Sequence, residues 1–413
     1  MTVRTVAACR VCGHDDWAEV ASFGDRPLPD AFIEPAASYA TEPKYPLDVI
    51  LCRHCGLMCL RHVVSAETLY DHYAYVSPRS ELMTGHMSEL AERCARWFDL
   101  AEDELVVELG SNAGLQLEHF AKLGARVLGV DPARNIAKMA NDNGIETLPL
   151  FFGRDTAAEI RAERGPAKLI LGRHVFAHVD DLTDLVAGVR ELLDERGGFV
   201  IEMPYLVDLL ASNQFDTIYH EHLSYFSVRT LCALFARHGM RVIDVVRVPV
   251  HGGSIVVAVA PEHSDRPTSA AVGELLDLER EAGLNDVATY HAFTERVEDI
   301  VSSVRKLVKK IVAEGRTVAG YGAPAKGTML LAACGFDQDD LVFCADTTTI
   351  KQGLVTPGSH IPVRSPAHAA ANPPDHYLLL AWNYRDEILR KEQAYLDAGG
   401  RFIVPIPSPE VLP

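Results

Sequence analysis

The stretch LVVELGSNAGLQLEHF, at residues 105–120, constrains the fold more than any other part of the chain. Residues 105–109 form an apolar run typical of a buried strand, residues 110–114 form a turn rich in small residues, and a helical pattern begins at Leu115. A strand, a glycine loop and a helix in this order make up the nucleotide-binding crossover of an open α/β sheet. We therefore expect an α/β protein with a ligand at the end of this strand.

The glycine loop differs from two common nucleotide-binding loops. It lacks the third glycine of a dinucleotide loop and the Gly-Lys-Ser/Thr of a P-loop. Its pattern, Glu108-x-Gly110-x-x-x-Gly114, resembles the first motif of class I S-adenosylmethionine methyltransferases. That resemblance implies that the loop backbone, which includes Asn112, passes close to the methionine part of the cofactor. Taken alone, the loop is also compatible with an ordinary βα turn.

The segments after the loop favour a methyltransferase core. ARVLGVDP at 125–132 predicts a second strand with Asp131 and then Pro132 at its end, and a carboxylate there can bond both ribose hydroxyls of a nucleoside. Residues 143–153 are expected near the adenine, and residues 167–182 predict a fourth strand that runs into a loop. The order of these elements makes an ordinary βα turn less favoured than a cofactor loop.

Two C-x-x-C pairs, Cys9 with Cys12 and Cys52 with Cys55, stand near the N-terminus. The chain has nine cysteines, and in a cytosolic protein, as expected here, this spacing favours metal over disulfides. Four thiolates complete a tetrahedral zinc site with no open position, so the zinc is expected to be structural. Residues 13–51 separate the pairs and exceed the roughly 15–20 residues of a compact ribbon, which predicts a sub-domain between them. Possible substitutes for one ligand are His14, His54 and Cys59.

The stretch DTIYHEHLSYFS, at 216–227, has no clear helical or strand period. Tyr219, His220, Glu221 and His222 stand side by side in it, and such a crowd of polar and aromatic side chains is not typical of a core segment. We interpret the stretch as part of an active site in which His220, alternating with Glu221, can point away. A surface loop with satisfied side chains is the alternative.

A second glycine loop, at 317–335, follows another predicted strand. Gly320, Gly322 and Gly327 lead into a helix, and Asp346 provides an acidic strand end further on. This is a weak dinucleotide signal. It leaves open a second cofactor or a purely structural second Rossmann-like domain.

The net charge of −18, from 39 basic and 57 acidic side chains, opposes binding of nucleic acid as a main function. No apolar run reaches the roughly 18–20 residues of a membrane span. The start MTVRTVAACRVCGHDD lacks the apolar region of a signal peptide, so a cytoplasmic protein is expected.

The length of 413 residues predicts two or three domains. We place them at 1–65 for a zinc-binding head, 66–265 for the methyltransferase core and 266–413 for a helical connector with a Rossmann-like domain. A single long helical stretch is predicted at about 268–313. The last segment, IPSPEVLP at 406–413, is predicted to be an irregular tail.

Together these motifs resemble one known family, the sugar C-methyltransferases that act on nucleotide-linked keto-deoxysugars in antibiotic biosynthesis. The resemblance covers nearly the whole chain and includes the paired C-x-x-C head, ELGSNAG, GVDP, HVFAHVDD, IEMPY, HGGS and the final K-Q-G…P-G-S-H-I-P-V segment. The combination of YHEHLSYFS with GYGAPAKG is the most specific part. The family implies three domains in the order predicted above, S-adenosylmethionine as cofactor, structural Zn²⁺, a dTDP-linked keto-deoxysugar as substrate and a monomeric enzyme.

The resemblance also implies roles for the polar residues. A base removes a proton beside the sugar ketone, and the enolate attacks the cofactor's methyl group. His222 is the leading base, since its unperturbed pKa near ~6.5 lets it stay neutral. Tyr219 can donate to the enolate oxygen or act as the base, and Glu221 can orient a histidine or hold a sugar hydroxyl. His178 lies in the loop where substrate and cofactor meet, and Tyr73 in DHYAYVSP matches an active-site tyrosine of the family. The sequence leaves the base undecided among His222, His178 and Tyr219.

The remaining expected contacts fall into two groups. Those with the cofactor are Glu108, Gly110, Asn112, Gly114, Asp131, Pro132 and His174. Those with the substrate are His251, Ser254, Tyr321 and Lys326. The alternatives are an O- or N-methyltransferase, an NAD-dependent nucleotide-sugar oxidoreductase that uses the second glycine loop, and a zinc-dependent nucleic-acid binding protein.

Overall fold

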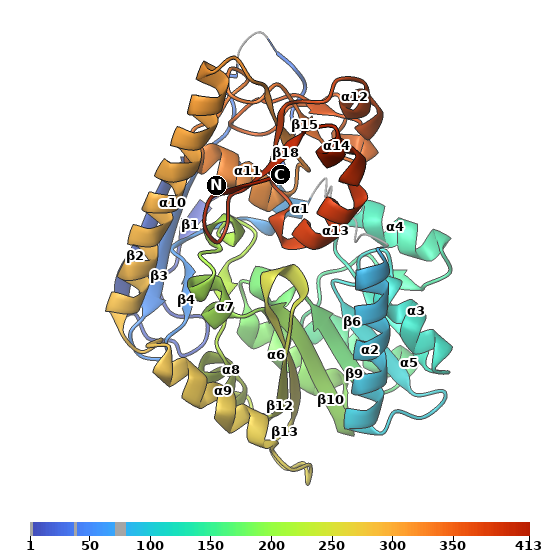
Figure 1. Cartoon of the computed structure of the whole chain (residues 1–413). Helices are drawn as coiled ribbons and strands as arrows, with labels where there is room; N and C mark the ends of the chain where they lie inside the picture. The colour runs from blue at the N-terminus through green and yellow to red at the C-terminus, as the bar shows by residue number, and fades with distance from the viewer. Residues whose placement is uncertain (1–2, 37–38, 71–79) are drawn as a thin grey trace.

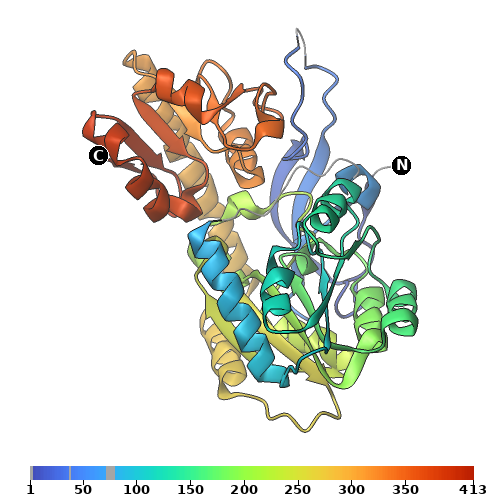
Figure 2. The ribbon, with the colours of Figure 1, turned by 90° about the vertical axis from the view of Figure 1, so that its right-hand side faces the viewer.

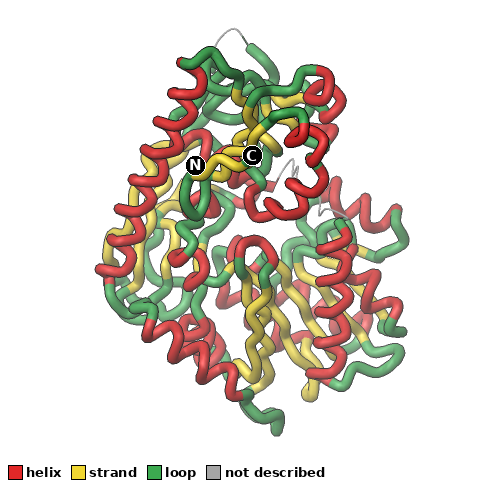
Figure 3. The backbone as a smooth tube through the Cα atoms, viewed as in Figure 1, coloured by secondary structure: helices red, strands yellow, loops and turns green. Residues whose placement is uncertain are grey.

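The computed structural model describes residues 3–36, 39–70 and 80–413. Its strands gather into a head, a core and a C-terminal unit, which Figure 3 shows as separate groups. The α/β fold predicted from the sequence is confirmed: the sheet that contains residues 105–109 is followed along the chain by a second, mostly parallel sheet.

The head contains a four-stranded antiparallel sheet in the order β11-β4-β3-β2 and a small ribbon of β1 and β5. Its elements are β1 (Val3–Thr5), β2 (Trp17–Arg26), β3 (Tyr45–Cys52), β4 (Met58–Leu60), β5 (His62–Val64) and α1 (Ala66–Tyr70). The edge strand β11 (Ser224–Tyr225) belongs to the YHEHLSYFS segment, far along the chain, and Ser224 pairs with Cys59. The predicted active-site segment is therefore built into the sheet of the head.

The core is a seven-stranded sheet in the order β12-β13-β10-β9-β6-β7-β8. Only β13 runs antiparallel to its neighbours β10 and β12. The strands are β6 (Leu105–Leu109), β7 (Arg126–Val130), β8 (Thr147–Leu148), β9 (Ala167–Arg173), β10 (Leu193–Pro204), β12 (Met240–Val248) and β13 (Ser254–Pro261). The predicted first strand and the helix that begins at Leu115 are both confirmed.

Helices cover both faces of the core sheet, as Figure 2 shows. They are α2 (Glu81–Phe98), α3 (Leu115–Lys122), α4 (Arg134–Asp142), α5 (Arg154–Arg164), α6 (Leu182–Leu192), α7 (Leu206–Ala211) and α8 (Val228–Arg237), with short turns η1 (Phe176–His178), η2 (Phe215–Thr217) and η3 (Val250–Gly252). Alternate strand residues face opposite layers: Val106 packs with α2 and α3, whereas Val107 packs with α5 and α6. Such strands are apolar throughout because both faces are buried.

The predicted single helix at 268–313 is two helices, α9 (Ala270–Glu281) and α10 (Val287–Ala313). The chain turns at Gly283, which has a φ of 72°, and the side chain of Asp286 caps α10 at the Ala288 amide. Helix α10 runs beside β2 of the head and continues to the C-terminal unit (Figure 1).

The C-terminal unit has a six-stranded sheet in the order β16-β15-β14-β17-β18-β19. Its elements are β14 (Val318–Tyr321), α11 (Ala325–Cys334), β15 (Cys344–Ala345), η4 (Thr349–Lys351), β16 (Val363–Arg364), α12 (Pro366–Ala371), β17 (His376–Leu379), η5 (Trp382–Tyr384), α13 (Arg385–Lys391), α14 (Gln393–Asp397), β18 (Arg401–Val404) and β19 (Glu410–Leu412). The predicted irregular tail is wrong in part, since β19 pairs antiparallel with β18.

In each of these two sheets the order of the parallel strands reverses at one place, between β6 and β9 in the core and between β14 and β17 in the C-terminal unit. Ligands of open α/β sheets bind beyond the carboxyl ends of the strands at such switch points. Residues that follow these four strands line one common cavity. The fold thus directs two potential ligand sites toward each other.

Candidate active site

A cavity of about 730 Å³ lies where the head, the core and the C-terminal unit meet. The core contributes the glycine loop, the loop after β9 and the segment before β11, while the C-terminal unit contributes the loops after β14 and β17. Among the predicted site residues, the cavity wall includes Glu108, Gly110, Asn112, Asp131, Pro132, His174, His178, Tyr219, Glu221, His222, His251 and Lys326. One cavity therefore joins most of the residues expected to hold cofactor and substrate.

The loop between β6 and α3, where the cofactor is expected, shapes one side of the cavity. Gly110 has a φ of 60°, and a Cβ there would lie 2.7 Å from Val175 Cγ2, so the position needs glycine. The amide of Asn112 donates to Asp131 Oδ2 at 2.9 Å, and the amide of Ala133 donates to Oδ1 at 2.9 Å. Burial raises the pKa of Asp131, although these two bonds favour its charged form.

Three polar atoms on this wall are buried with no partner among the described residues: Glu108 Oε2, Ser111 Oγ and Gln116 Oε1. Burial raises the pKa of Glu108 to about 8. Buried polar atoms rarely stay unpaired in a native protein, so their grouping on one wall indicates a ligand with several hydrogen-bonding groups. The amino acid and ribose parts of S-adenosylmethionine carry such groups, and the wall fits them.

The buried carboxylate of Glu202, which the sequence did not predict as a site residue, orients the neighbouring His174. Glu202 on β10 accepts His174 Nε2–H at 2.8 Å and His86 Nε2–H at 2.7 Å. Burial opposes its charge, but Arg173 and the two histidines hold the pKa of Glu202 well below its usual range. His174 also contacts His251, with ring centroids 4.4 Å apart. Glu202 therefore fixes the orientation of the His174 ring, which in turn packs against His251 on the cavity wall.

The segment before β11 places an imidazole between two other rings. The ring centroid of His222 lies 4.1 Å from that of Tyr219 and 5.0 Å from that of His178. His222 Nδ1–H donates to the Thr217 carbonyl at 2.7 Å, which leaves Nε2 as the proton-accepting nitrogen. Burial, with the positive charge of Lys326, lowers the pKa of His222 to about 4. The ring is therefore neutral at physiological pH.

Glu221 faces a buried ion pair that joins the head to the C-terminal unit. Lys351 Nζ donates to Asp30 Oδ1 at 3.1 Å and to the Ala323 carbonyl at 3.0 Å. Burial and the nearby Asp30 charge raise the pKa of Glu221 to about 8. All three ionisable side chains line the cavity. Asp30 and Lys351 could not be predicted from the sequence, since their 321-residue separation leaves no local signal.

Lys326 brings a cation to the cavity from the start of α11. Its ammonium lies 4.9 Å from the ring centroid of Trp382, whose indole N–H donates to Asp216 Oδ2 at 2.6 Å. Burial lowers the pKa of Lys326, and the nearby Asp216 charge works against that shift. Lys326 thus lines the cavity, where its side chain can bind an anionic ligand.

Several predicted residues lie elsewhere. Gly114 is the N-cap residue of α3 and lies outside the cavity wall. The Ser254 hydroxyl donates to the Val250 carbonyl. Tyr321 donates its hydroxyl to Glu392 Oε1 at 2.7 Å, also outside the wall. His220 donates from Nε2 to the Tyr45 carbonyl in the head. Tyr73 lies outside the described residues.

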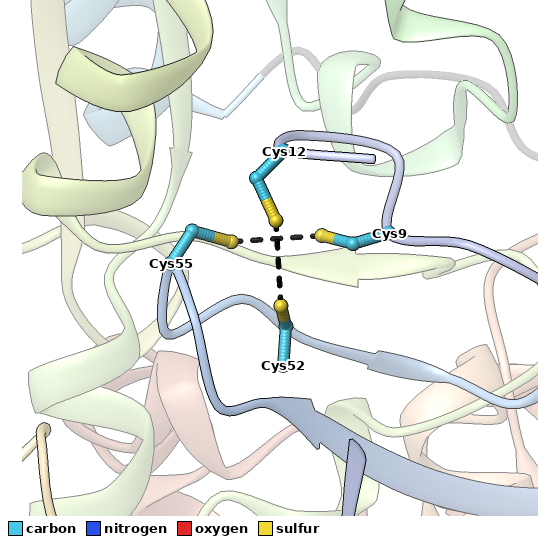
Figure 4. A group of neighbouring side chains, drawn as sticks. All are labelled: Cys9, Cys12, Cys52 and Cys55. Atoms are coloured by element: carbon cyan, nitrogen blue, oxygen red, sulfur yellow. Dashed lines mark hydrogen bonds between the residues drawn. The ribbon is translucent and has the colours of Figure 1, made fainter. Parts of the chain in front are cut away.

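The four predicted metal ligands converge in the head, as Figure 4 shows. The sulfurs of Cys9, Cys12, Cys52 and Cys55 all lie within 4.8 Å of one another. Two of these distances, Cys9 to Cys55 and Cys12 to Cys52, are 3.5 Å. A tetrahedral zinc ion with Zn–S bonds of about 2.3 Å requires sulfurs about this far apart. The four thiols therefore fit structural Zn²⁺, and the three substitute ligands considered above are not needed.

Family models match three consecutive parts of the chain: a zinc binding domain at 9–70, a methyltransferase domain at 80–245 and a C-methyltransferase C-terminal domain at 249–407. C-methyltransferase NovU from Streptomyces niveus is 50% identical to the chain over 410 residues, which cover 99% of this chain and 98% of NovU. The chain belongs to the C-methyltransferase family. The resemblance drawn from its motifs is thereby confirmed, together with an S-adenosylmethionine-dependent core and a four-cysteine zinc site.

Other similarities are partial. A ubiquinone biosynthesis O-methyltransferase from Rhodopseudomonas palustris (strain BisA53) is 24% identical over 139 residues, which cover 32% of this chain and 55% of that protein. The crystal structure of the PH0226 protein from Pyrococcus horikoshii OT3 aligns with a TM-score of 0.35 at 13% identity, over 46% of this chain and 97% of that one.

Within the described ranges, helices long and apolar enough to cross a bilayer are absent.

Proposed function

We propose that this C-methyltransferase methylates a carbon beside the C-4 ketone of a dTDP-linked deoxysugar, at carbon 3 or carbon 5, as a monomer in antibiotic sugar biosynthesis. The observation that carries the proposal is the position of His222. Its neutral imidazole lines the same cavity as the cofactor loop and Lys326. A carbon nucleophile needs a base of this kind, because a ring C–H must first lose its proton.

The hydrogen bond of His222 to Thr217 assigns the two ring nitrogens different roles. Nε2 takes the proton from the sugar carbon, and the electrons of that C–H bond move into the adjacent ketone to form an enolate. The Tyr219 ring packs against the His222 ring at a tilt of 31°, and its hydroxyl can donate to the enolate oxygen. One such donor contributes about 3 kcal/mol of transition-state stabilisation. We propose that Glu221, neutral because its pKa is raised, holds a sugar hydroxyl.

Bound S-adenosylmethionine would supply the electrophilic methyl group. The glycine loop and Asp131 would hold its amino acid and ribose, and the unpaired Glu108 oxygen would receive one of its donors. The protein's own residues then have to align the sugar carbon with the methyl group and exclude water from the cavity. Alignment of reacting groups in a closed site can contribute about 7–11 kcal/mol to catalysis.

We assign the dTDP part of the substrate to the C-terminal side of the cavity. Lys326 and the first residues of α11 line the wall there, and a helix N-terminus with a nearby lysine suits a diphosphate. An NAD role for this loop is less favoured. Asp346, the acidic strand end that would bind a ribose, is not on the cavity wall and accepts backbone N–H groups from Ala323 and Thr348.

The proposal is tested by incubating the enzyme with a dTDP-4-keto-deoxysugar and S-adenosylmethionine carrying a ¹³C methyl group. We expect a ¹³C methyl signal coupled to one ring carbon. The matched 4-hydroxy sugar should give no product, because it has no ketone to acidify the carbon. A methyl signal typical of oxygen or nitrogen attachment would favour the O- or N-methyltransferase alternative, and the absence of transfer would refute the substrate class.

A further inference from the structure

Arg10 lies between the zinc ligands Cys9 and Cys12 in the sequence, and its side chain bonds to residues outside the metal site. Its side chain is only 4% exposed. Nε donates to Asp180 Oδ1 at 3.0 Å, and Nη1 donates to the Leu223 carbonyl at 3.3 Å. One guanidinium therefore extends from the head into the core.

The two acceptors belong to the two loops that carry the histidines of the site. Asp180 follows His178 by two residues, and Leu223 follows His222 directly. The loops are also joined to each other, because the Leu223 amide donates to the Ala177 carbonyl at 2.8 Å. Arg10 contacts both loops at this junction.

The charges of Arg10 and Asp180 favour a stable ion pair between them. Burial raises the pKa of Asp180, but Arg4 and Arg10 more than offset it, and the pKa ends below its usual range. The Leu223 carbonyl also accepts the Leu60 amide of β4 at 3.0 Å, so the head holds this peptide group from two directions. The Arg10 guanidinium also interacts with the buried Cys59 thiol on β4, so the head holds the arginine as well as the peptide group.

We propose that Arg10 is a positioning residue through which the zinc knuckle sets the relative placement of His178 and His222. The inference deepens the proposed function, since it rests on the roles given there to the two histidines. The zinc would fix the turn that carries Arg10, and Arg10 would fix the two loops. This gives the structural metal a defined consequence for catalysis, although it has no contact with the substrate.

The chain offers a matched control. Arg53 follows Cys52 just as Arg10 follows Cys9, so both arginines occupy the second position of a C-x-x-C pair. The Arg53 side chain is 50% exposed and pairs with Asp16 on the surface of the head. Arg10→Met and Arg53→Met thus remove the same group from equivalent positions, and only the first loses contacts to the core.

Three quantities would be measured for both variants: zinc per chain, hydrogen–deuterium exchange of the peptide over 217–225, and the kinetics of methyl transfer to the dTDP-keto-sugar. For Arg10→Met we expect full zinc, faster exchange at Leu223, and a kcat lowered roughly 10–100-fold with the KM for S-adenosylmethionine unchanged. Added guanidinium should restore part of the rate, whereas Arg53→Met should match the wild type. If Arg10 only stabilised the fold, its loss would lower stability, but it would not lower kcat at an unchanged KM, and added guanidinium would not restore the rate.

Unchanged exchange and kcat in Arg10→Met, or equal losses in Arg53→Met, would overturn the inference. If Arg10→Met loses zinc, the Arg10→Lys variant is measured in its place. The lysine keeps the positive charge but cannot bridge two acceptors as a guanidinium does. A zinc-loaded lysine variant with lowered kcat supports the proposal, and one with normal kcat overturns it. If the wild type does not methylate the keto-sugar, the proposed function fails, and the exchange measurement alone decides the role of Arg10.

Discussion

Replacing His222 with asparagine tests the assignment of the base with little disturbance of the loop. The amide nitrogen of asparagine can take the place of Nδ1–H, so the bond to Thr217, 2.7 Å in the structure, can be kept. Only Nε2 is lost. A positioned general base contributes about 10²–10⁴-fold, which corresponds to about 3–5 kcal/mol of activation free energy. We expect kcat to fall by that factor while the affinity for S-adenosylhomocysteine stays the same.

The pH profile of the wild type gives a second signature of the same residue. Burial lowers the pKa of His222 to about 4, so the base stays neutral well below the ordinary histidine value of about 6.5. The acid limb of the rate should therefore lie near pH 4 and be absent in the asparagine variant. The free energy of unfolding depends on the same group. The unfolded chain binds this proton near pH 6.5 and the folded chain only near pH 4, so stability falls as the pH drops from about 6.5 toward 4.

The assay is steady-state methyl transfer across this pH range, and His220→Gln is the control. His220 lies two residues away, outside the cavity wall, and glutamine can keep its bond to the Tyr45 carbonyl. The control should retain nearly the wild-type rate. An asparagine variant within threefold of wild type, or an acid limb near pH 6.5, would refute His222 as the base and direct attention to His178 or Tyr219.

Three further predictions follow from the structure. Asp131→Asn should weaken binding of S-adenosylhomocysteine by about 10–100-fold in calorimetry, because charged hydrogen bonds are worth about 1.5–3 kcal/mol; unchanged affinity would contradict the assignment of the cofactor site. Lys326→Met should raise the KM for the dTDP-sugar while cofactor affinity is kept, and a larger effect on the cofactor would contradict the placement of the diphosphate. Metal analysis should find one zinc per chain, and chelation or Cys52→Ser should lower the melting temperature, since structural zinc contributes directly to folding; a head that melts normally without zinc would argue against that role.

The sequence predicted those parts of the site that depend on short segments. The strand at 105–109, the glycine loop after it and the acid at Asp131 follow one another locally, so pattern and spacing were sufficient. The four cysteines were predictable for the same reason, because each C-x-x-C is a local turn and zinc chemistry supplies the pairing.

The parts that were missed depend on contacts between distant segments. Arg10 and Asp180 are 170 residues apart, and neither stands out within its own segment. Glu202 sits inside a buried strand, where sequence alone gives no sign of the histidines it holds. The short strand β19 was likewise not predicted, because its residues show no strand pattern and only their pairing with β18 defines it. The helix break near Gly283 did have a local signal, a glycine followed by a capping aspartate, that was overlooked.

The most direct test of the account is solvent exchange at the sugar itself. The enzyme is loaded with S-adenosylhomocysteine and a dTDP-4-keto-deoxysugar in D₂O, and deuterium is followed by NMR. We expect exchange at a single ring carbon next to the ketone, lost in His222→Asn, which would also identify carbon 3 or carbon 5 as the site of methylation. No exchange at either carbon in this loaded complex would contradict the enolate mechanism.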